Sequence, residues 1–354
     1  MRLLLVTNDY PPKLGGIQNY LANLVDRYPD PVRVLAPRSS GAPADLRVGR
    51  GRWGFMLPRR RVADWIEAEA RDFAAEFILF GAPSPLPWLG GRLRERLGIP
   101  FGIVAHGAEL SIPAAVPGFR RLVVGPLRDA DVVFTNSRFT TGVVERLRGR
   151  PVTYLGVGID LERFHPPPQP VTTRLVGCVS RLVPRKGQAE LIRATASLRR
   201  SGSQAALLVV GSGRTLSQLR RLAHKLGVHA RFEVGVADAV LPDLYREMAA
   251  FAMPCRSRWF GLEAEGLGIV FLEAAASGLP VIAGNSGGAP ETVIPGTTGF
   301  VVGNQRELEV ALDSLLSDPE RAQAMGKAGR AFMEEQFSWE KVMQRLASGL
   351  SSGN

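Results

Sequence analysis

Two groups of residues in this sequence have the types and spacing that hold an anionic ligand. Gly15 and Gly16 follow an apolar run and precede a helical pattern. Glycine lets a backbone approach a phosphate there, and the first amides of a helix donate hydrogen bonds to it. Arg181 and Lys186, followed by Gly187, come after a second apolar run and can neutralise a diphosphate.

A third group consists of two glutamates. Glu265 and Glu273 are separated by a mostly apolar stretch that continues to Ala283, and a carboxylate in such surroundings usually has a partner or a task. If the segment is helical, its eight positions span about 12 Å. That length would place Glu265 at one end of a nucleotide sugar and Glu273 at the ribose diol. Gly266 and Gly268 would let the helix start approach the ligand.

Short apolar runs and helical patterns alternate along the chain, which predicts parallel sheets with helices on both faces. In the first part we predict strands at 2–7, 32–36, 77–80, 101–105, 132–135 and 152–154, and helices at 17–25, 63–76, 88–97 and 138–148. In the second part we predict strands at 175–180, 206–210, 231–234, 251–253 and 280–283, and helices at 188–200, 216–226, 243–249, 267–277, 305–316 and 319–336.

A cluster of prolines at 166–170 marks a stiff linker between these two series. We therefore predict two Rossmann-like domains that face each other across a cleft, residues 1–168 and residues 169–336. A last helix within 337–354 could pack onto either domain. Doubly wound sheets of this kind bind their ligands at the carboxyl ends of the strands.

Composition narrows the class of protein. The chain has 354 residues, of which 45% are hydrophobic and 22% charged, a balance typical of globular domains. No apolar run reaches the roughly 18 residues of a membrane-spanning helix, and the apolar start is too short for a secretory signal. The two cysteines provide neither a disulfide framework nor a cysteine metal site. These features favour a soluble cytoplasmic protein.

The usual cofactor motifs are absent. Gly211 and Gly213 follow a predicted strand, but Leu216 stands where a dinucleotide-binding motif would have its third glycine. Asp129 and Asp131 are spaced like a metal-binding pair, yet they lie where a helix meets a strand, which favours a structural role. The four histidines form no ligand cluster. We therefore prefer a reaction that needs no metal.

The net charge of +11 is concentrated in one acid-free stretch. Residues 47–61 contain six arginines, and apolar side chains stand between them. Cations interleaved with apolar residues suit an anionic membrane surface. The alternative is a solvated loop whose Trp53 packs back onto the core. Nucleic acid is disfavoured because no recognisable binding module is present.

Read in order, these motifs resemble the retaining glycosyltransferases of family 4, which have the GT-B fold. The resemblance covers nearly the whole chain. Within that family the sequence looks most like the mannosyltransferases that extend phosphatidylinositol mannosides with GDP-mannose. The motifs that carry it are Gly15-Gly16, His106-Gly107, Gly158-Ile159-Asp160, the Glu265/Glu273 pair, and the segments 8–18, 180–187, 263–268 and 287–291.

This resemblance implies a role for each matching residue around the donor. The backbone of Gly16 contacts the diphosphate, with Gly15 beside it. Arg181 and Lys186, in the motif that ends at Gly187, hold the diphosphate and stabilise the leaving GDP. Glu265 binds sugar hydroxyls, and Glu273 binds the ribose.

Further roles follow from the same resemblance. Amides near Ile269 and Val270 contribute at the phosphate and ribose, and backbone near Val236 meets the base. His106 faces the sugar and its developing positive charge. The resemblance implies a front-face reaction without a metal, in which the donor phosphate takes the acceptor proton.

The implied partners are a nucleotide sugar, a glycolipid acceptor and the inner face of the plasma membrane, where the enzyme would be peripheral. Other readings remain open. One is a family 4 enzyme that uses UDP-glucose or UDP-N-acetylglucosamine with another lipid or a soluble acceptor. A nucleotide-sugar epimerase and a non-catalytic binding protein are the others.

Overall fold

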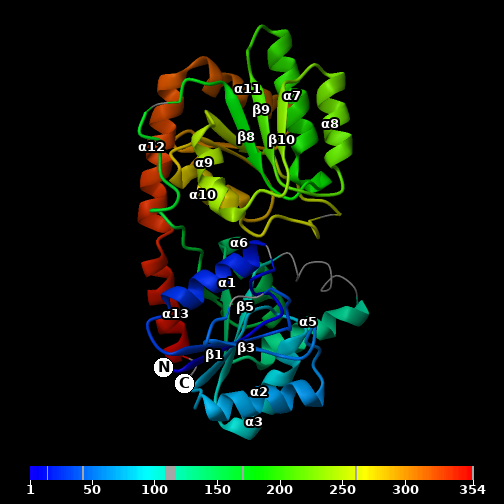
Figure 1. Ribbon diagram of the computed structural model, residues 1–354, viewed down its shortest axis with the longest axis vertical. Helices are drawn as coiled ribbons and strands as arrows, with labels where there is room; N and C mark the ends of the chain where they lie inside the picture. The colour runs from blue at the N-terminus through cyan, green and yellow to red at the C-terminus, as the bar shows by residue number, and fades with distance from the viewer. Residues whose placement is uncertain (14, 42–43, 108–116, 170, 260, 353–354) are drawn as a thin grey trace. The chain divides into compact units, whose positions relative to one another are not determined.

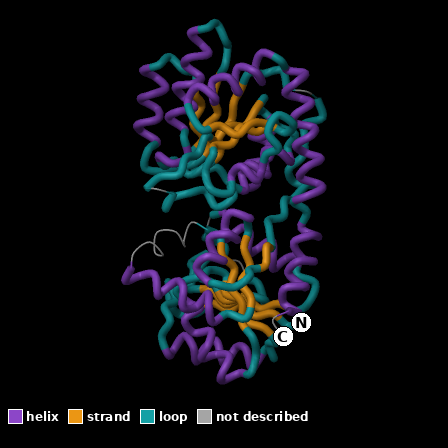
Figure 2. Tube along the Cα trace, turned by 180° about the vertical axis from the view of Figure 1, so that it is seen from behind, coloured by secondary structure: helices purple, strands orange, loops and turns teal. Residues whose placement is uncertain are grey.

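A computed structural model divides the chain into two compact units. The N-terminal unit comprises residues 1–157 and 339–354, and the C-terminal unit comprises residues 158–338. The structure describes residues 1–354 except 14, 42–43, 108–116, 170, 260 and 353–354. In each unit the strands form a sheet with helices on both of its faces (Figures 1 and 2). The predicted α/β fold of two Rossmann-like domains is confirmed.

The N-terminal unit is built on a parallel sheet in the order β3-β2-β1-β4-β5-β6-β7. Its strands are β1 (Leu3–Val6), β2 (Val32–Ala36), β3 (Val48–Arg50), β4 (Phe77–Phe80), β5 (Phe101–Ala105), β6 (Val132–Thr135) and β7 (Thr153–Tyr154). Its helices are α1 (Gly16–Arg27), α2 (Arg60–Asp72), the 3₁₀ turn η1 (Leu86–Leu89), α3 (Gly90–Leu97), α5 (Pro117–Asp129), α6 (Arg138–Arg148) and α13 (Trp339–Ser352).

Continuous apolar runs form the central strands because both faces of this sheet are covered. All residues of β1, β4, β5 and β6 are buried. In the pairing between strands, Leu3 stands beside Val32 on one side and Phe77 on the other. Strand β3 was not predicted, because its three half-buried residues include a glycine and an arginine and carry no apolar pattern.

The C-terminal helix α13 belongs to the N-terminal unit. The ring of Trp339 lies 5.8 Å from that of Tyr20, and the guanidinium of Arg27 lies 5.1 Å from the Trp339 ring. Further along the helix, Gly349 comes so close to Phe134 that an added Cβ would lie 2.4 Å from the Phe134 ring. Helix α13 therefore packs against the N-terminal unit, although it follows the C-terminal unit in the sequence.

The C-terminal unit is built on a second parallel sheet, in the order β10-β9-β8-β11-β12-β13. Its strands are β8 (Leu175–Val179), β9 (Ala206–Val210), β10 (Ala230–Glu233), β11 (Ala250–Met253), β12 (Val281–Gly284) and β13 (Gly299–Val302). Its helices are η2 (Pro184–Lys186), α7 (Gln188–Arg200), α8 (Leu216–Lys225), η3 (Asp238–Val240), α9 (Leu241–Arg246), α10 (Ile269–Ala276), η4 (Ala289–Thr292), α11 (Gln305–Ser317) and α12 (Pro319–Gln336).

The division between the units lies ahead of the proline cluster, so the predicted boundary at residue 168 falls inside the C-terminal unit. The residues before the prolines are already attached to that unit. Arg330 donates hydrogen bonds to the carbonyls of Leu161 and Phe164, and the Phe164 ring packs against Tyr245 at 5.8 Å. These contacts fix the chain ahead of the linker that composition indicated.

Candidate functional site

The loops that follow β8 and β11 pack backbone to backbone at the carboxyl edge of the second sheet. Arg256 donates its amide to the carbonyl of Arg185 at 2.8 Å. Gly187 has a φ of +79°, and a Cβ added there would lie 2.2 Å from the carbonyl oxygen of Pro254. Glycine is required at this point because any larger residue would force the two loops apart.

A buried cluster of charges lies where these loops meet. A single oxygen of Glu265, Oε2, accepts hydrogen bonds from Lys186 Nζ at 2.7 Å and from Arg185 Nη1 at 2.6 Å. All three side chains are buried. Burial would raise the pKa of the Glu265 carboxyl, but the charges of Lys186 and Arg185 outweigh burial and lower it. Glu265 is therefore an anion held between two cations.

The backbone of Glu265 is fixed by the loop after β12. Its amide donates to Ser286 Oγ at 3.2 Å, and its carbonyl accepts from the amide of Gly288 at 2.9 Å. A Cβ added to Gly287, whose φ is +55°, would lie 1.9 Å from that same carbonyl oxygen. The glycine pair 287–288 thus permits the close approach that orients Glu265.

Glu265 and Glu273 do not share one helix, so the helical spacing considered for the pair from the sequence does not apply. Helix α10 begins at Ile269, after Gly268 takes the left-handed conformation with φ of +88°. Glu265 lies in the loop before that turn, so the two carboxylates are not related by eight helical positions. Ile269 and Val270 are the first two residues of α10, where backbone amides have no partner within the helix.

Glu273 lies further along α10 and has the partner that its apolar surroundings predicted. Tyr245 donates its hydroxyl to Glu273 Oε2 at 2.8 Å. Burial raises the pKa of the Glu273 carboxyl to about 7, and the hydrogen bond from Tyr245 opposes that rise. Burial likewise raises the pKa of the Tyr245 hydroxyl. The carboxyl of Glu273 therefore changes its charge near neutral pH.

Two other predicted residues of this unit stand apart from the buried cluster. Arg181 follows β8 but is exposed, and its guanidinium has no ion pair or hydrogen bond within the described part of the chain. Val236 is half-buried in the loop after β10. The structure thus gathers Lys186, Glu265 and Arg185, and leaves Arg181 open to solvent.

The N-terminal unit places its predicted residues at the carboxyl ends of β1 and β5. Gly15 and Gly16 are exposed at the start of α1. A Cβ added to Gly15 would meet the Gln18 side chain, which donates to Asp9 at 2.7 Å. His106 is buried directly after β5 and donates from Nε2 to the carbonyl of Gly81 at 2.9 Å.

One of the two aspartates that could have formed a metal pair, Asp131, has other partners. Asp131 accepts from the amide of Phe101 at 2.9 Å and from Arg94 at 2.9 Å. Both of its oxygens therefore hold the sheet and α3 together. Over the ranges that the structure describes, no group of three or more potential metal ligands occurs.

The acid-free stretch 47–61 divides into two parts in the structure. Arg47 pairs with Asp26 and Asp45, Trp53 packs against Trp65 at 5.8 Å, and Met56 is fully buried. The outward part carries Phe55 (52% exposed), Leu57 (41% exposed) and the exposed arginines 59–61. The core-packing alternative is thus correct for Trp53, and the second part, together with the exposed Arg52, is available to a surface.

Two residues of the site were not assigned from sequence. Arg185 lies in the quoted motif, but nothing in the order Arg181, Arg185, Lys186 shows which cations are buried. Tyr245 lies 28 residues before Glu273, on a different helix. A partner for Glu273 was expected from its apolar surroundings, yet its identity depends on how α9 packs against α10.

Comparison with known proteins defines the class and the family. The fold is that of GT-B glycosyltransferases. It matches Anabaena HepE in complex with UDP (TM-score 0.81, 22% identity, 99% of this chain and 100% of that one). It also matches a sucrose-phosphate synthase of Thermosynechococcus elongatus (TM-score 0.81, 22% identity, 98% and 97%). The model for "Glycosyltransferase Family 4" matches residues 14–163, and that for "Glycosyl transferases group 1" matches residues 162–332.

The chain belongs to glycosyltransferase family 4, as its motifs predicted. It is 40% identical to the GDP-mannose-dependent alpha-(1-6)-phosphatidylinositol monomannoside mannosyltransferase of Mycolicibacterium smegmatis. It is 41% identical to the Mycobacterium tuberculosis protein of the same name. Each alignment covers 99% of this chain and 98% of the relative. A Corynebacterium glutamicum enzyme named for the monoacylated acceptor is 37% identical over the same shares.

The raised pKa of Glu273 predicts that stability falls as pH rises. Between about pH 4.5 and pH 7 the unfolded chain releases this proton while the folded chain retains it. Glu273→Gln removes the proton exchange. Relative to wild type, the Gln variant should therefore gain about 1–3 kcal/mol of unfolding free energy between pH 4.5 and pH 8. Urea unfolding at both pH values measures this.

The matched control for this experiment is Glu320→Gln, at an exposed glutamate in the first turn of α12. Its pH profile should follow that of wild type. If the profile of Glu273→Gln also followed wild type, the carboxyl would not be holding a proton in the folded state.

Proposed function

We propose that this protein transfers an α-mannosyl residue from GDP-mannose, with retention, to a phosphatidylinositol mannoside acceptor. The observation that carries the proposal is 40–41% identity, across 99% of the chain, to enzymes named for that donor and acceptor. The buried cation–carboxylate cluster supports it, because nucleotide-sugar transfer needs fixed charges for both the diphosphate and the sugar hydroxyls.

Lys186 is the residue best placed to hold the donor diphosphate. An ammonium has three donors, and one of them is engaged by Glu265 in the structure. The remaining donors can meet phosphate oxygens while the ion pair keeps the side chain in place. Arg181, exposed and without an acidic partner among the described residues, adds a second cation. Gly187 keeps the loop close to the ligand.

The two carboxylates then act at different parts of the donor. Glu265 is ionised and rigid, so it can accept hydrogen bonds from sugar hydroxyls. Glu273 accepts from the ribose diol, and the amides at Ile269 and Val270 donate to the phosphate and ribose. The backbone at Val236 contacts the base.

The reaction requires that the charges formed when the bond between sugar and phosphate breaks be stabilised. Cleavage leaves an electron pair on the β-phosphate of GDP and positive charge at the anomeric carbon. Lys186 and Arg181 stabilise the departing diphosphate. The acceptor hydroxyl attacks the same face and gives its proton to the departing phosphate oxygen. In the N-terminal unit, Gly16, next to Gly15, contacts the diphosphate through its backbone, and His106 faces the sugar.

Removing either cation should slow the chemical step. Lys186→Ala and Arg181→Ala should each lower kcat for mannosyl transfer at least about 10²-fold, by analogy with lost transition-state donors. The assay measures radiolabelled mannose that passes from GDP-mannose into extracted phosphatidylinositol mannosides.

The matched controls are Lys225→Ala and Arg221→Ala, at exposed positions on α8. Both should transfer at the wild-type rate. Because Lys186 is buried, unfolding temperatures of all four variants are compared first. Near-normal turnover in a folded Lys186 or Arg181 variant would contradict the assignment.

We further propose that the reaction needs no metal, because Lys186 and Arg181 supply the positive charge that a cation would otherwise bring to the diphosphate. Transfer measured after EDTA treatment should equal the untreated rate. Recovery of a lost rate on adding Mg²⁺ or Mn²⁺ would contradict this proposal.

We also propose that the enzyme works as a peripheral protein on the anionic inner face of the plasma membrane. No helix in the described ranges is both long and apolar enough to cross a bilayer. The outward part of the basic stretch, arginines 59–61 with Phe55 and Leu57, offers charge and apolar side chains together.

Replacing these three arginines should weaken membrane binding. Because each basic residue near an anionic surface contributes about 1 kcal/mol, the triple Arg59/Arg60/Arg61→Ala variant should bind phosphatidylglycerol vesicles about 10- to 100-fold more weakly. Binding of wild type should also fall as salt rises. Vesicle sedimentation measures both effects.

A control of equal charge change is Arg214/Arg221/Lys225→Ala, which removes three exposed cations from the C-terminal unit. It should sediment with vesicles as wild type does. Equal losses in the two triple variants would attribute the binding to net charge alone and remove the special role of residues 59–61.

A further inference from the structure

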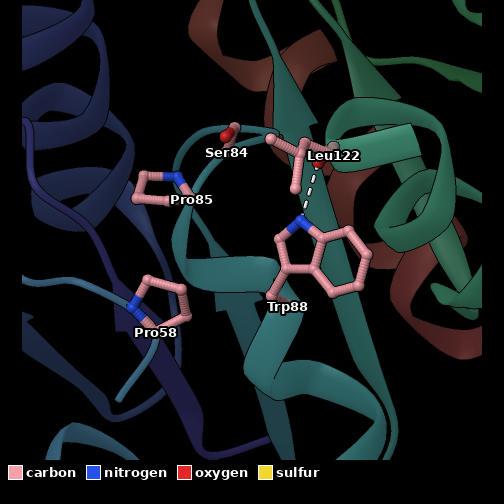
Figure 3. A pocket seen from close by; sticks show the side chains of 5 residues that line it. All are labelled: Pro58, Ser84, Pro85, Trp88 and Leu122. Carbon is pink, nitrogen blue, oxygen red and sulfur yellow. Dashed lines mark hydrogen bonds between the residues drawn. The ribbon is translucent and has the colours of Figure 1, made fainter. Parts of the chain in front are cut away.

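An apolar pocket opens in the N-terminal unit, and none of the residues that line it has been given a role above. Its volume is about 410 Å³, within the roughly 300–1,000 Å³ typical of small-molecule sites. The lining residues come from three segments that are distant in sequence: Pro58, Ser84, Pro85, Trp88 and Leu122 (Figure 3).

The walls of this pocket are mostly apolar, with the Ser84 hydroxyl among them. The indole nitrogen of Trp88 donates to the carbonyl of Leu122 at 2.7 Å, so its single polar group is already engaged (Figure 3). Trp88 and Leu122 nevertheless remain 45% exposed each. Large apolar side chains that converge on a pocket and stay accessible mark a site for an apolar ligand.

One loop links the pocket to His106, the residue predicted to face the sugar. Ser84 and Pro85 belong to the loop that leaves β4, and the carbonyl of Gly81 in that loop accepts from His106 at 2.9 Å. Three residues of chain reach at most about 11 Å, so Ser84 lies within that distance of Gly81. Part of the pocket wall and the partner of His106 therefore lie on one loop, within about 11 Å of each other.

In two of the three segments that line the pocket, exposed arginines are the next residues in the chain. Arg59 directly follows Pro58 and begins the basic group 59–61. Arg120 and Arg121 directly precede Leu122 and are exposed as well. A carbon-lined pocket flanked by cations complements a molecule that joins an aliphatic chain to an anionic head group.

We propose that this pocket binds one acyl chain of the phosphatidylinositol-type acceptor, while the arginines face its phosphate. The inference rests on the proposed function, because that function supplies a lipid acceptor. It adds a subsite that would lift the acceptor partly out of the bilayer and hold its head group near His106. Each methylene that enters the pocket should strengthen binding about fourfold.

The test compares two acceptors in the absence of any bilayer. One is dioctanoyl phosphatidylinositol monomannoside below its critical micelle concentration, and the other is the same head group without acyl chains. Wild type should prefer the acylated acceptor at least tenfold in kcat/KM, because two buried methylenes already contribute about 16-fold. The KM for GDP-mannose should not differ between the two.

Two variants change the pocket in different ways. Leu122→Asn places an amide of similar size in the wall, and Ser84→Phe fills the space from an exposed position. Both should reduce the preference to below about threefold and leave kcat/KM for the deacylated acceptor unchanged. The matched control, Val310→Asn, alters a 62% exposed valine on α11 in the C-terminal unit and should keep the preference.

Direct binding separates the failure of this inference from that of the proposed function. Dioctanoyl phosphatidylinositol is titrated into each variant by calorimetry, again without vesicles. If wild type transfers to neither acceptor but binds this lipid in a Leu122-dependent way, the pocket stands and the proposed function falls. If the two pocket variants keep the full acyl preference, or if wild type shows neither preference nor binding, the pocket assignment is overturned. If Trp88 and Leu122 only inserted into a bilayer, wild type would show neither the acyl preference nor lipid binding in these vesicle-free assays.

Discussion

One carboxylate oxygen organises the C-terminal unit. Glu265 Oε2 accepts hydrogen bonds from both Lys186 and Arg185, and all three side chains are buried. Buried charges are costly unless each is paired and hydrogen-bonded, so loss of this one carboxylate would remove the partner of Lys186 and leave Arg185 with its 3.6 Å contact to Glu263. The loops after β8, β11 and β12 therefore have to meet at a fixed distance. The close backbone approaches at Gly187 and Gly287 follow from that requirement.

The same ion pair explains how a strongly basic protein can hold a buried cation in place for a ligand without leaving its charge unpaired. Glu265 offsets the charge of Lys186 but occupies one of its three donors. Glu273 is the complementary case: burial raises its pKa to about 7, although the hydrogen bond from Tyr245 and the charge of Arg163 oppose that rise. One carboxylate is thus fixed as an anion, and the other can respond to what binds beside it.

The sequence predicted the elements well where burial alone decides them. The runs at 32–36, 77–80 and 101–105 became strands with those bounds, because apolar residues on both faces leave few other structures. The start of α10 was wrong because a left-handed glycine at 268 interrupts a pattern that otherwise looks helical. The buried partner Arg185 could not be identified, since ion pairs across about 80 residues depend on loop packing that no local pattern records.

The basic stretch 47–61 shows why composition locates a charged surface only approximately. Its charge and aromatic content suggested one membrane-facing segment, yet Arg47 is paired with two aspartates and Trp53 packs against Trp65. These residues flank the edge strand β3, and the two aspartates offset the charge of Arg47 within the protein. The outward remainder, from Phe55 to the three arginines at 59–61, leads directly through Pro58 into the apolar pocket. The residues that looked like one linear motif are therefore divided. One part lies at the edge strand β3, and the other lies beside the apolar pocket.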